Sequence, residues 1–306
     1  MKALAFGEVL WDIFGTHKYP GGAPLNVAVH LSRLGFDSAI FSAVGMDPNG
    51  MELVDVIASE GVGTGYIAQV NEYDTGETRV QLQHGIPDYV FNEPCAWDDI
   101  TMSTEKLEQL LAEKWDVFCF GTLAQRSVSS RRTLERVLSR IQTRIRFFDV
   151  NLRKEFYSRS ILESSLEHTD ILKMNNEECP IIADLFFPDI CSENTPENIL
   201  RLLLCRKLTK MFDLEGVLVT CGKDGTEAYF REQRYVVRPA DVPVIDTVGA
   251  GDSFSAGFLA SYAIGQKIQT ALETGSLLAD YVVSHNGAFP EYELFLQADL
   301  QRRLKL

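Results

Sequence analysis

The sequence predicts an α/β fold in which helices cover both faces of a mostly parallel sheet. Short apolar runs, typical of buried strands, alternate with segments of helical periodicity along most of the chain. Such alternation produces right-handed β-α-β crossovers, which build parallel sheets. With 306 residues, of which 45% are hydrophobic, the chain can bury a large core. No linker, internal repeat or low-complexity stretch divides it, so residues 1–306 are expected to form one α/β domain.

The predicted strands and helices follow one another regularly. The first half contains a strand at 3–6, a helix at 24–34, a strand at 39–44, a helix at 51–59 and a strand at 117–120. The second half contains a helix at 130–142, a strand at 146–150, a helix at 161–166, strands at 171–174 and 217–220, and helices at 254–263 and 268–284. The first helix places Leu25, Ala28 and Leu31 on one face and ends at Gly35.

Two stretches break this pattern. Residues 12–22 are short and rich in glycine, and residues 77–100 alternate apolar and polar positions around an expected turn at 84–88. Both are predicted to be antiparallel β additions to the α/β body. Ordinary hairpin decoration is the alternative.

The composition argues against several classes of function. A formal net charge of −14 and an isoelectric point near 4.8 argue against nucleic-acid binding, which needs a basic surface. The chain has no 18-residue apolar run and no signal peptide, so a cytoplasmic protein is expected. The six cysteines lack zinc or redox spacing, and the five histidines form no metal-binding helix motif.

The most informative stretch is 246–252, which reads Asp-Thr-Val-Gly-Ala-Gly-Asp. A β-prone segment at 242–245 precedes it, and helical periodicity follows it. The small residues at 249–251 let backbone N–H groups converge at a helix N-terminus, which suits a phosphate or a transferring phosphoryl group. Asp252 beside this anion hole could accept a proton from an attacking hydroxyl. Taken alone, the stretch also fits a glycine-rich turn with Asp252 as helix N-cap.

Two separated motifs give the chain a family resemblance. Residues 246–252 resemble the C-terminal signature of the ribokinase-like (PfkB) sugar kinases, and residues 21–28, Gly-Gly-Ala-Pro-Leu-Asn-Val-Ala, resemble their N-terminal signature. The Gly-Gly-Ala-Pro variant and residues 7–12, Gly-Glu-Val-Leu-Trp-Asp, are most similar to the bacterial fructokinase branch. The resemblance implies a three-layer ribokinase-like fold with a small β-sheet lid, formed by residues 12–22 and 77–100, over the sugar.

The resemblance also implies how phosphoryl transfer would occur. Asp252 would accept the proton of a primary hydroxyl, and the N–H groups of Gly249, Ala250 and Gly251 would hold the charge on the transferred group. Arg153 would neutralise the same group. From the residues alone, Arg153 could also be a surface charge or bind an anionic substrate.

The sugar-binding residues that the resemblance implies come from four parts of the chain. They are Asp12, Gly22, Asn26, Tyr89, Phe91, Asn151, Arg153 and Asp252. A turn or capping role is the alternative for the first three, and core packing is the alternative for the two aromatic residues.

The nucleotide and ion sites are implied in the second half of the chain. The nucleotide-binding residues are Asn175, Glu178, Thr220, Gly222, Gly225, Gly249, Ala250 and Gly251. Glu178 would organise Mg²⁺ through water, although helix capping is the alternative for this glutamate. K⁺ would lie between Asp246 and the loop at 286–290, with the backbone of Val248 and Gly287 as further ligands. On the helix predicted at 268–284, many members of the resembled family carry an asparagine, and Gly275 is the residue that aligns with it.

The predicted function is an ATP-dependent sugar kinase that converts D-fructose to fructose 6-phosphate. ATP, Mg²⁺ and K⁺ are expected to bind, and a homodimer through the lid would cover its exposed strand edges. Three alternatives stay open: a kinase for a sugar acid such as 2-keto-3-deoxygluconate, a ribose or nucleoside kinase, and an inactive sugar-binding module on the kinase fold. Asp12 would repel a carboxylate, Gly-Gly-Ala-Pro differs from the ribokinase Gly-Gly-Lys-Gly, and the retained Asp252 argues against the inactive module.

Overall fold

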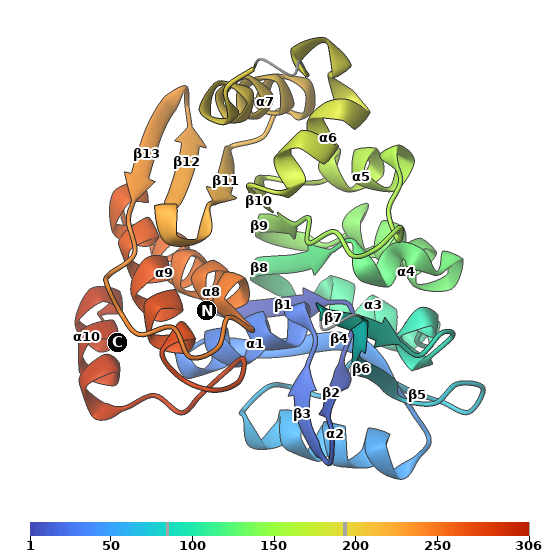
Figure 1. Ribbon diagram of the computed structural model, residues 1–306. Helices are drawn as coiled ribbons and strands as arrows, with labels where there is room; N and C mark the ends of the chain where they lie inside the picture. The colour runs from blue at the N-terminus through green and yellow to red at the C-terminus, as the bar shows by residue number, and fades with distance from the viewer. Residues whose placement is uncertain (84–85, 192–194, 306) are drawn as a thin grey trace.

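A nine-stranded sheet forms the centre of the fold, as Figure 1 shows. The computed structural model describes residues 1–83, 86–191 and 195–305. The strand order is β13-β12-β11-β10-β9-β8-β1-β4-β5; the strands from β11 to β5 are parallel, and β12 is antiparallel to both its neighbours. These strands are β1 (Lys2–Phe6), β4 (Asp37–Gly45), β5 (Ile67–Val70), β8 (Lys114–Gly121), β9 (Gln142–Asp149), β10 (Ile171–Asn175), β11 (Gly216–Thr220), β12 (Thr226–Phe230) and β13 (Gln233–Val237).

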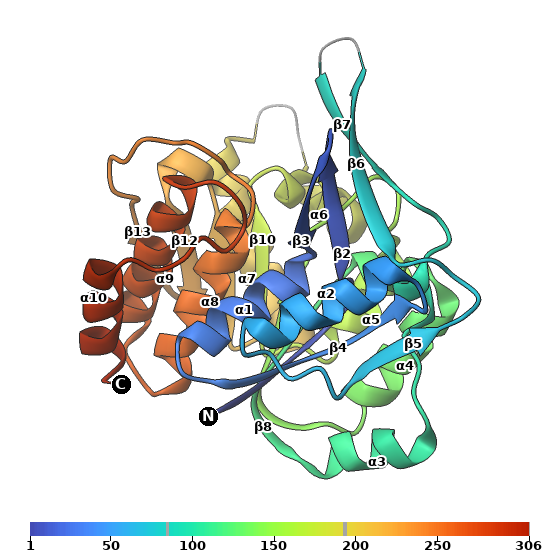
Figure 2. The same cartoon turned by 90° about the horizontal axis from the view of Figure 1, so that it is seen from below.

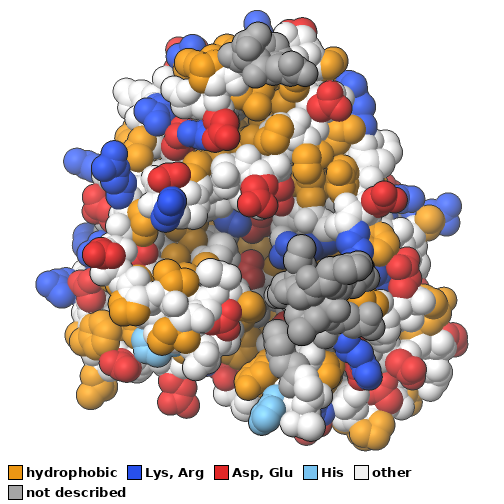
Figure 3. All heavy atoms as spheres, viewed as in Figure 1, with side chains coloured by type: hydrophobic (Ala, Val, Ile, Leu, Met, Phe, Trp, Pro, Cys, Tyr) orange, Lys and Arg blue, Asp and Glu red, His pale blue; other side chains and the backbone are white. Residues whose placement is uncertain are grey.

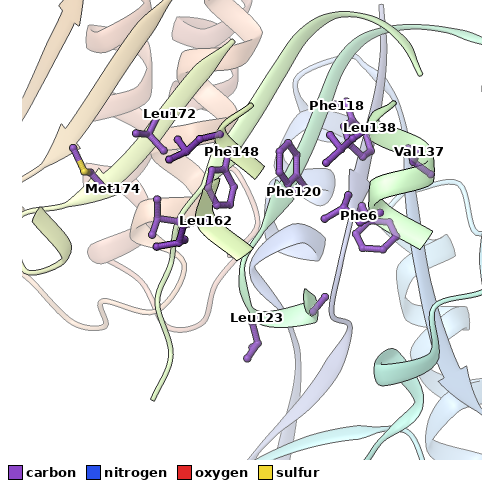
Figure 4. Close-up of a cluster of buried hydrophobic side chains, with 14 of the residues drawn as sticks. Phe6, Phe118, Phe120, Leu123, Val137, Leu138, Phe148, Leu162, Leu172 and Met174 are labelled. Carbon is purple, nitrogen blue, oxygen red and sulfur yellow. The ribbon is translucent and has the colours of Figure 1, made fainter. Parts of the chain in front are cut away.

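Helices cover both faces of this sheet. One face carries α3 (Thr104–Ala112), α4 (Val128–Leu138), α5 (Arg159–Leu166), α6 (Glu178–Phe186) and α7 (Glu197–Phe212). The other carries α1 (Ala23–Arg33), α2 (Pro48–Ser59), α8 (Ala250–Ala263), α9 (Ile268–Val283) and α10 (Leu294–Leu304). Alternate residues of β1 enter the two cores: Phe6 packs on the α3–α7 side (Figure 4), and Ala5 packs on the other. The predicted three-layer α/β fold is confirmed.

A smaller sheet of four strands stands beside the main one. Its order is β3-β2-β6-β7, with β2 (Leu10–Phe14), β3 (His17–Gly21), β6 (Gly76–Gln83) and β7 (Ile86–Phe91). Figure 2 shows both hairpins projecting from the body of the molecule. Each hairpin is antiparallel, as expected, but β2 and β6 pair in parallel. Of the turn expected at 84–88, residues 84 and 85 lie outside the described residues.

The β-prone segment predicted at 242–245 is not a strand. The structure shows irregular backbone there, with the side chains of Val244 and Ile245 67% and 59% exposed. Pro239 and Pro243 lack the N–H groups that a strand must donate to its neighbour. The start of α8 is therefore approached by an irregular segment.

The helix predicted at 130–142 is shifted towards the N-terminus. It is α4, and it begins at Val128 because the Ser127 hydroxyl accepts a hydrogen bond from the Ser129 N–H at 3.2 Å. It ends at Leu138, and β9 already begins at Gln142. The hydrophobic pattern of the sequence did not predict β5, α3, α7, β12, β13 or α10. Across the described ranges, no helix is long and apolar enough to cross a membrane.

Candidate active site

Two adjoining cavities lie where the parallel strands end. The first, of about 460 Å³, is covered by lid residues, and the second, of about 570 Å³, lies beside the β11–β12 hairpin. Thr220, Thr247 and Gly251 line both cavities, so the two meet at the start of α8. Figure 3 shows the hollow in the centre of this face, with acidic side chains in it. Ligand sites were expected at this edge of the sheet.

The turn before α8 is shaped by Gly249. This residue has a φ of 75°, and a Cβ on it would lie 2.6 Å from the Cα of Ala288. A glycine is therefore needed both for the left-handed backbone and for the close approach of the two loops. The N–H groups of Gly249 and Gly251 have no acceptor among the described residues. The Ala250 N–H donates to the Thr247 carbonyl at 3.3 Å, so it makes a long bond within the turn.

Asp252 lies in the first turn of α8, against α1. Its Oδ2 accepts a hydrogen bond from Asn26 Nδ2 at 2.7 Å. Burial, followed by the charge of Asp149, raises the pKa of Asp252 to about 6, while Asn26 and the cations of Lys173 and Arg153 oppose the rise. The carboxylate is thus mostly ionised at neutral pH, as a base must be.

The first cavity brings together the predicted sugar-binding residues whose side chains or backbone are described. Its lining includes Asp12, Gly22, Asn26, Phe91, Asn151, Arg153 and Asp252. Asp12 lies within β2 of the lid rather than directly after β1, and Gly21 leaves the space that its carboxylate occupies. Burial raises the pKa of Asp12 to about 6, although the guanidinium of Arg153 opposes this.

Phe91 and Tyr89 are the two aromatic residues of the lid that were predicted to contact the sugar. Phe91 lines the cavity and also packs edge-on against Trp97, with ring centroids 6.5 Å apart. Both alternatives considered for this residue therefore apply. The backbone of Tyr89 belongs to β7, but its side chain lies outside the described part of the structure.

The second cavity is lined by several of the residues predicted to bind the nucleotide. Thr220, Gly222 and Gly225, from the turn between β11 and β12, line it on one side. The other side is formed by Ser276, Ala279, Asp280 and Val283 of α9. The turn is therefore both a hairpin connection and a wall of the cavity.

Gly275 does not contribute to this wall. A Cβ on it would lie 2.7 Å from the Phe254 carbonyl oxygen and 3.1 Å from the Phe254 ring, so the residue serves the packing of α8 against α9. The next residue, Ser276, faces the cavity instead.

Asn175 and Glu178 hold the start of α6. Asn175 Oδ1 accepts hydrogen bonds from the N–H groups of Glu177 and Glu178, each at 2.9 Å, which is a capping role. Glu178 accepts from the N–H groups of Leu152 and Asn175, each at 2.7 Å, so it fastens the ends of two strands together. Both residues also line the first cavity, next to the anion hole.

Asp246 joins two loops beside the anion hole. Its Oδ1 accepts from the Val248 N–H and its Oδ2 from the Gly287 N–H, each at 3.0 Å. The three residues predicted for the potassium site are thus adjacent. Carboxylate and carbonyl oxygens are the ligand types that a hard cation prefers.

The chain matches known proteins along almost its whole length. The model of the pfkB family of carbohydrate kinases matches residues 2–292. The chain belongs to this family. The predicted family resemblance is therefore confirmed, and this protein is a carbohydrate kinase.

Individual relatives agree with the family assignment. This carbohydrate kinase is 33% identical to a fructokinase of Klebsiella pneumoniae over 80% of the chain and 77% of that protein. It is 30% identical to an uncharacterized sugar kinase of Pyrococcus horikoshii over 83% of the chain and 80% of that protein. The structure of the Pyrococcus protein in complex with ATP superimposes with a TM-score of 0.75, at 26% identity, over 94% of this chain and 93% of that one.

Three charged residues in the site of this kinase received no role from the sequence. Glu8, Asp149 and Lys173 all line the first cavity. Burial, aided by the charge of Asp252, raises the pKa of Glu8 to about 7. Each of the three lies within or just after a parallel strand, and this position was the available signal.

Proposed function

We propose that this kinase transfers the γ-phosphate of ATP to the hydroxyl on carbon 6 of D-fructose. The observation that carries the proposal is the position of Asp252, where the lid-covered cavity meets the second cavity at the start of α8. A sugar in the first cavity and a triphosphate entering from the second would meet beside this carboxylate. The fructokinase of Klebsiella pneumoniae and the ATP complex of the Pyrococcus kinase support the choice of sugar and of nucleotide.

The residues of the turn would carry the chemistry. Asp252 would accept the proton of the primary hydroxyl as its oxygen attacks the γ-phosphorus and the bond to the departing ADP breaks. The N–H groups of Gly249 and Gly251 would hold the charge on the transferring group, with the Ala250 N–H joining them if its long bond to Thr247 is released. Arg153 lines the same cavity and would neutralise that charge from the rim.

The charge of the sugar cavity favours a neutral substrate. Five carboxyl groups line it, those of Glu8, Asp12, Asp149, Glu178 and Asp252, against two cationic side chains, Arg153 at the rim and the buried Lys173. The carboxylate of a sugar acid would be repelled by the carboxylate of Asp12, which argues against such a substrate. Asn26 Oδ1 is buried without a partner among the described residues and could accept a hydrogen bond from a sugar hydroxyl. The lining residues Asp12, Gly22, Phe91 and Asn151 would complete the sugar site. Tyr89 is proposed as a further sugar-binding residue on the basis of its sequence position alone.

The residues present fit the two expected ions. Glu178, beside Asn175, would hold Mg²⁺ through water next to the triphosphate, where the ion neutralises phosphate charge. Thr220, Gly222 and Gly225 would bind the nucleotide itself. No cluster of three or more His, Cys, Asp or Glu side chains suitable for direct metal ligation occurs in the described ranges. Asp246 with the backbone of Val248 and Gly287 would hold K⁺.

A homodimer through the lid is part of the proposal. β3 and β7 are the edge strands of the lid sheet in a single copy of the chain. A second lid would cover such an edge and close the sugar site from outside.

A substrate screen tests the proposed function. ADP release is measured with fructose, tagatose, ribose, 2-keto-3-deoxygluconate and adenosine, and kcat/KM is compared. Fructose should give the highest value. A preference for 2-keto-3-deoxygluconate would replace the proposal with a sugar-acid kinase, and turnover with none of the five would favour the inactive binding module.

The rate should fall in acid because Asp252 must be ionised. Its pKa is raised to about 6, so the carboxylate form is lost as the pH falls through this value. We expect kcat/KM for fructose to be level near pH 7.5 and to decline below about pH 6. Asp12, with a pKa of about 6, and Glu8, with a pKa of about 7, titrate in the same region.

One substitution identifies the group whose protonation causes the fall of kcat/KM at low pH, the acid limb of the profile. Asn26→Ala removes the hydrogen bond that lowers the pKa of Asp252, so the limb should move to higher pH. The measurement is the pH profile of kcat/KM for both proteins. A limb that stays in place would assign it to another group, and a rate that is constant down to pH 5 would contradict Asp252 as the base.

Potassium should activate the enzyme. A Cβ on Gly249 would contact Ala288, so the anion hole and the 286–290 loop are packed directly together, and a cation between them would fix the hole. The measurement is kcat in potassium, sodium and tetramethylammonium buffers of equal ionic strength, with saturating ATP and Mg²⁺. Potassium should give the highest rate, and equal rates in all three would count against this ion site.

A further inference from the structure

A buried ion pair lies directly beneath the anion hole. Lys173 of β10 stands opposite Asp149 of β9 in the register of the two strands, and its Nζ is 2.6 Å from Asp149 Oδ2. The two side chains are only 7% and 14% exposed. Neither belongs to the motifs by which the function was predicted.

The ammonium group of Lys173 reaches the turn that precedes α8. A Cβ on Gly251 would lie 3.3 Å from Lys173 Nζ, so this glycine leaves room for the ammonium as well as for a ligand. Gly251 also carries one of the N–H groups without an acceptor in the described part of the chain. The cation and the free amide therefore adjoin the same point of the cavity wall.

The surroundings keep Lys173 charged. The carboxylates of Asp149, Asp252 and Glu178 together raise the pKa of this lysine, although burial alone would lower it. Asp149 is its only hydrogen-bond acceptor among the described residues, which leaves further N–H donors of the ammonium for a ligand.

The pair is not explained by stability alone. Desolvation of two buried charges offsets most of their attraction, and apolar replacements of such pairs are often as stable. The first cavity also carries five carboxylates, from Glu8, Asp12, Asp149, Glu178 and Asp252. A triphosphate entering it would be repelled unless a cation lay at the point of transfer. Arg153 is exposed at the rim, whereas Lys173 is buried at the hole itself.

We propose that Lys173 is a further catalytic residue, which donates hydrogen bonds to the non-bridging oxygens of the transferring phosphoryl group. Asp149 is its positioning residue. This inference rests on the proposed function and adds a cation to the backbone amides of the anion hole. The hydroxyl proton still passes to Asp252 and ADP still leaves; Lys173 keeps its proton throughout, so the balance of the reaction is unchanged.

The test removes the pair in two ways. Lys173→Met alone leaves Asp149 buried without a partner and can destabilise the protein, so the decisive variant is the double substitution Lys173→Met with Asp149→Asn. A matched control is Lys207→Met, which breaks the exposed Lys207–Asp189 pair of 2.8 Å on the surface. Melting temperatures establish that all variants are folded.

Two readouts separate a catalytic role from a structural one. The first is kcat with the best sugar of the screen, which should fall about 10- to 100-fold in the double variant, as expected for lost hydrogen bonds to a charged group. The second is the decrease in the Kd for ADP when aluminium fluoride, a mimic of the transferring phosphoryl group, is added. It is measured by calorimetry in the absence of any sugar. We expect the variant to lose this tightening while its affinity for ADP alone stays the same.

The outcomes are distinct. A double variant with wild-type kcat and wild-type tightening would overturn the proposal and leave the pair a structural one. Because the fluoride readout needs no sugar, it tests Lys173 even if fructose proves to be the wrong substrate. Lys207→Met should match the wild type in both readouts.

Discussion

Asp252→Asn should abolish most turnover while the protein remains folded. Positioned acid–base groups contribute on the order of 10²–10⁴-fold in rate, and kcat should fall within this range. The substitution keeps the shape of the side chain, and its amide oxygen can still accept from Asn26 Nδ2. It also removes the repulsion with Asp149 that raises the pKa of the carboxyl, so the melting temperature should not fall. Steady-state kinetics and thermal unfolding measure the two effects.

The affinity for ATP gives the control for this variant. The Kd for ATP should change little, because Asp252 does not line the second cavity. Asp299→Asn, which removes a carboxylate from α10 that pairs with Arg302 and Arg303, should behave as the wild type. A kcat for Asp252→Asn within a few-fold of the wild-type value would contradict its role as base.

Asp12→Ala should weaken sugar binding selectively. A carboxylate in β2 of the lid can accept hydrogen bonds from two hydroxyls, and each charge-assisted bond contributes roughly 1.5–3 kcal/mol. Loss of one raises the KM for fructose at least about tenfold, and loss of both on the order of a hundredfold or more. The KM for ATP should stay nearly constant because Asp12 does not line the second cavity. Initial rates over both substrate ranges measure the two constants.

A charge comparison completes this prediction. Asp12→Asn keeps one acceptor without the negative charge, so its KM for fructose should lie between those of the wild type and the alanine variant. If Asp12→Ala improves the use of 2-keto-3-deoxygluconate and leaves fructose unharmed, Asp12 excludes acidic substrates and does not bind hydroxyls. The substrate assignment would then be wrong.

The central strands of the main sheet could be predicted because they are largely buried on both faces. Apolar runs such as 3–6 and 217–220 leave little doubt about position, and β1 and β11 occur there. The segment at 242–245 has the same apolar character, but Pro243 in its middle has no N–H to donate, and the segment stays outside the sheet. The composition of a short segment does not reveal whether its backbone N–H groups can form the hydrogen bonds of a sheet.

The site, like the fold, could be predicted only in part. The motif at 246–252 fixes a backbone shape, so the position of the anion hole follows from local sequence. The contact from Asn26 to Asp252 joins residues 226 positions apart, and that between Lys173 and Asp149 depends on the register of two strands. A single sequence carries no direct signal for such pairings. The parallel pairing of β2 with β6 in the lid escaped prediction for this reason too.

The product formed from fructose and ATP tests the central claim most directly. The enzyme is incubated with both, and the products are identified by phosphorus–proton correlation NMR. We expect ADP and fructose 6-phosphate in equal amounts, because the proposed sugar site would place the hydroxyl on carbon 6 against Asp252. Phosphate on another carbon, or ADP formed with free phosphate and no sugar phosphate, would contradict it.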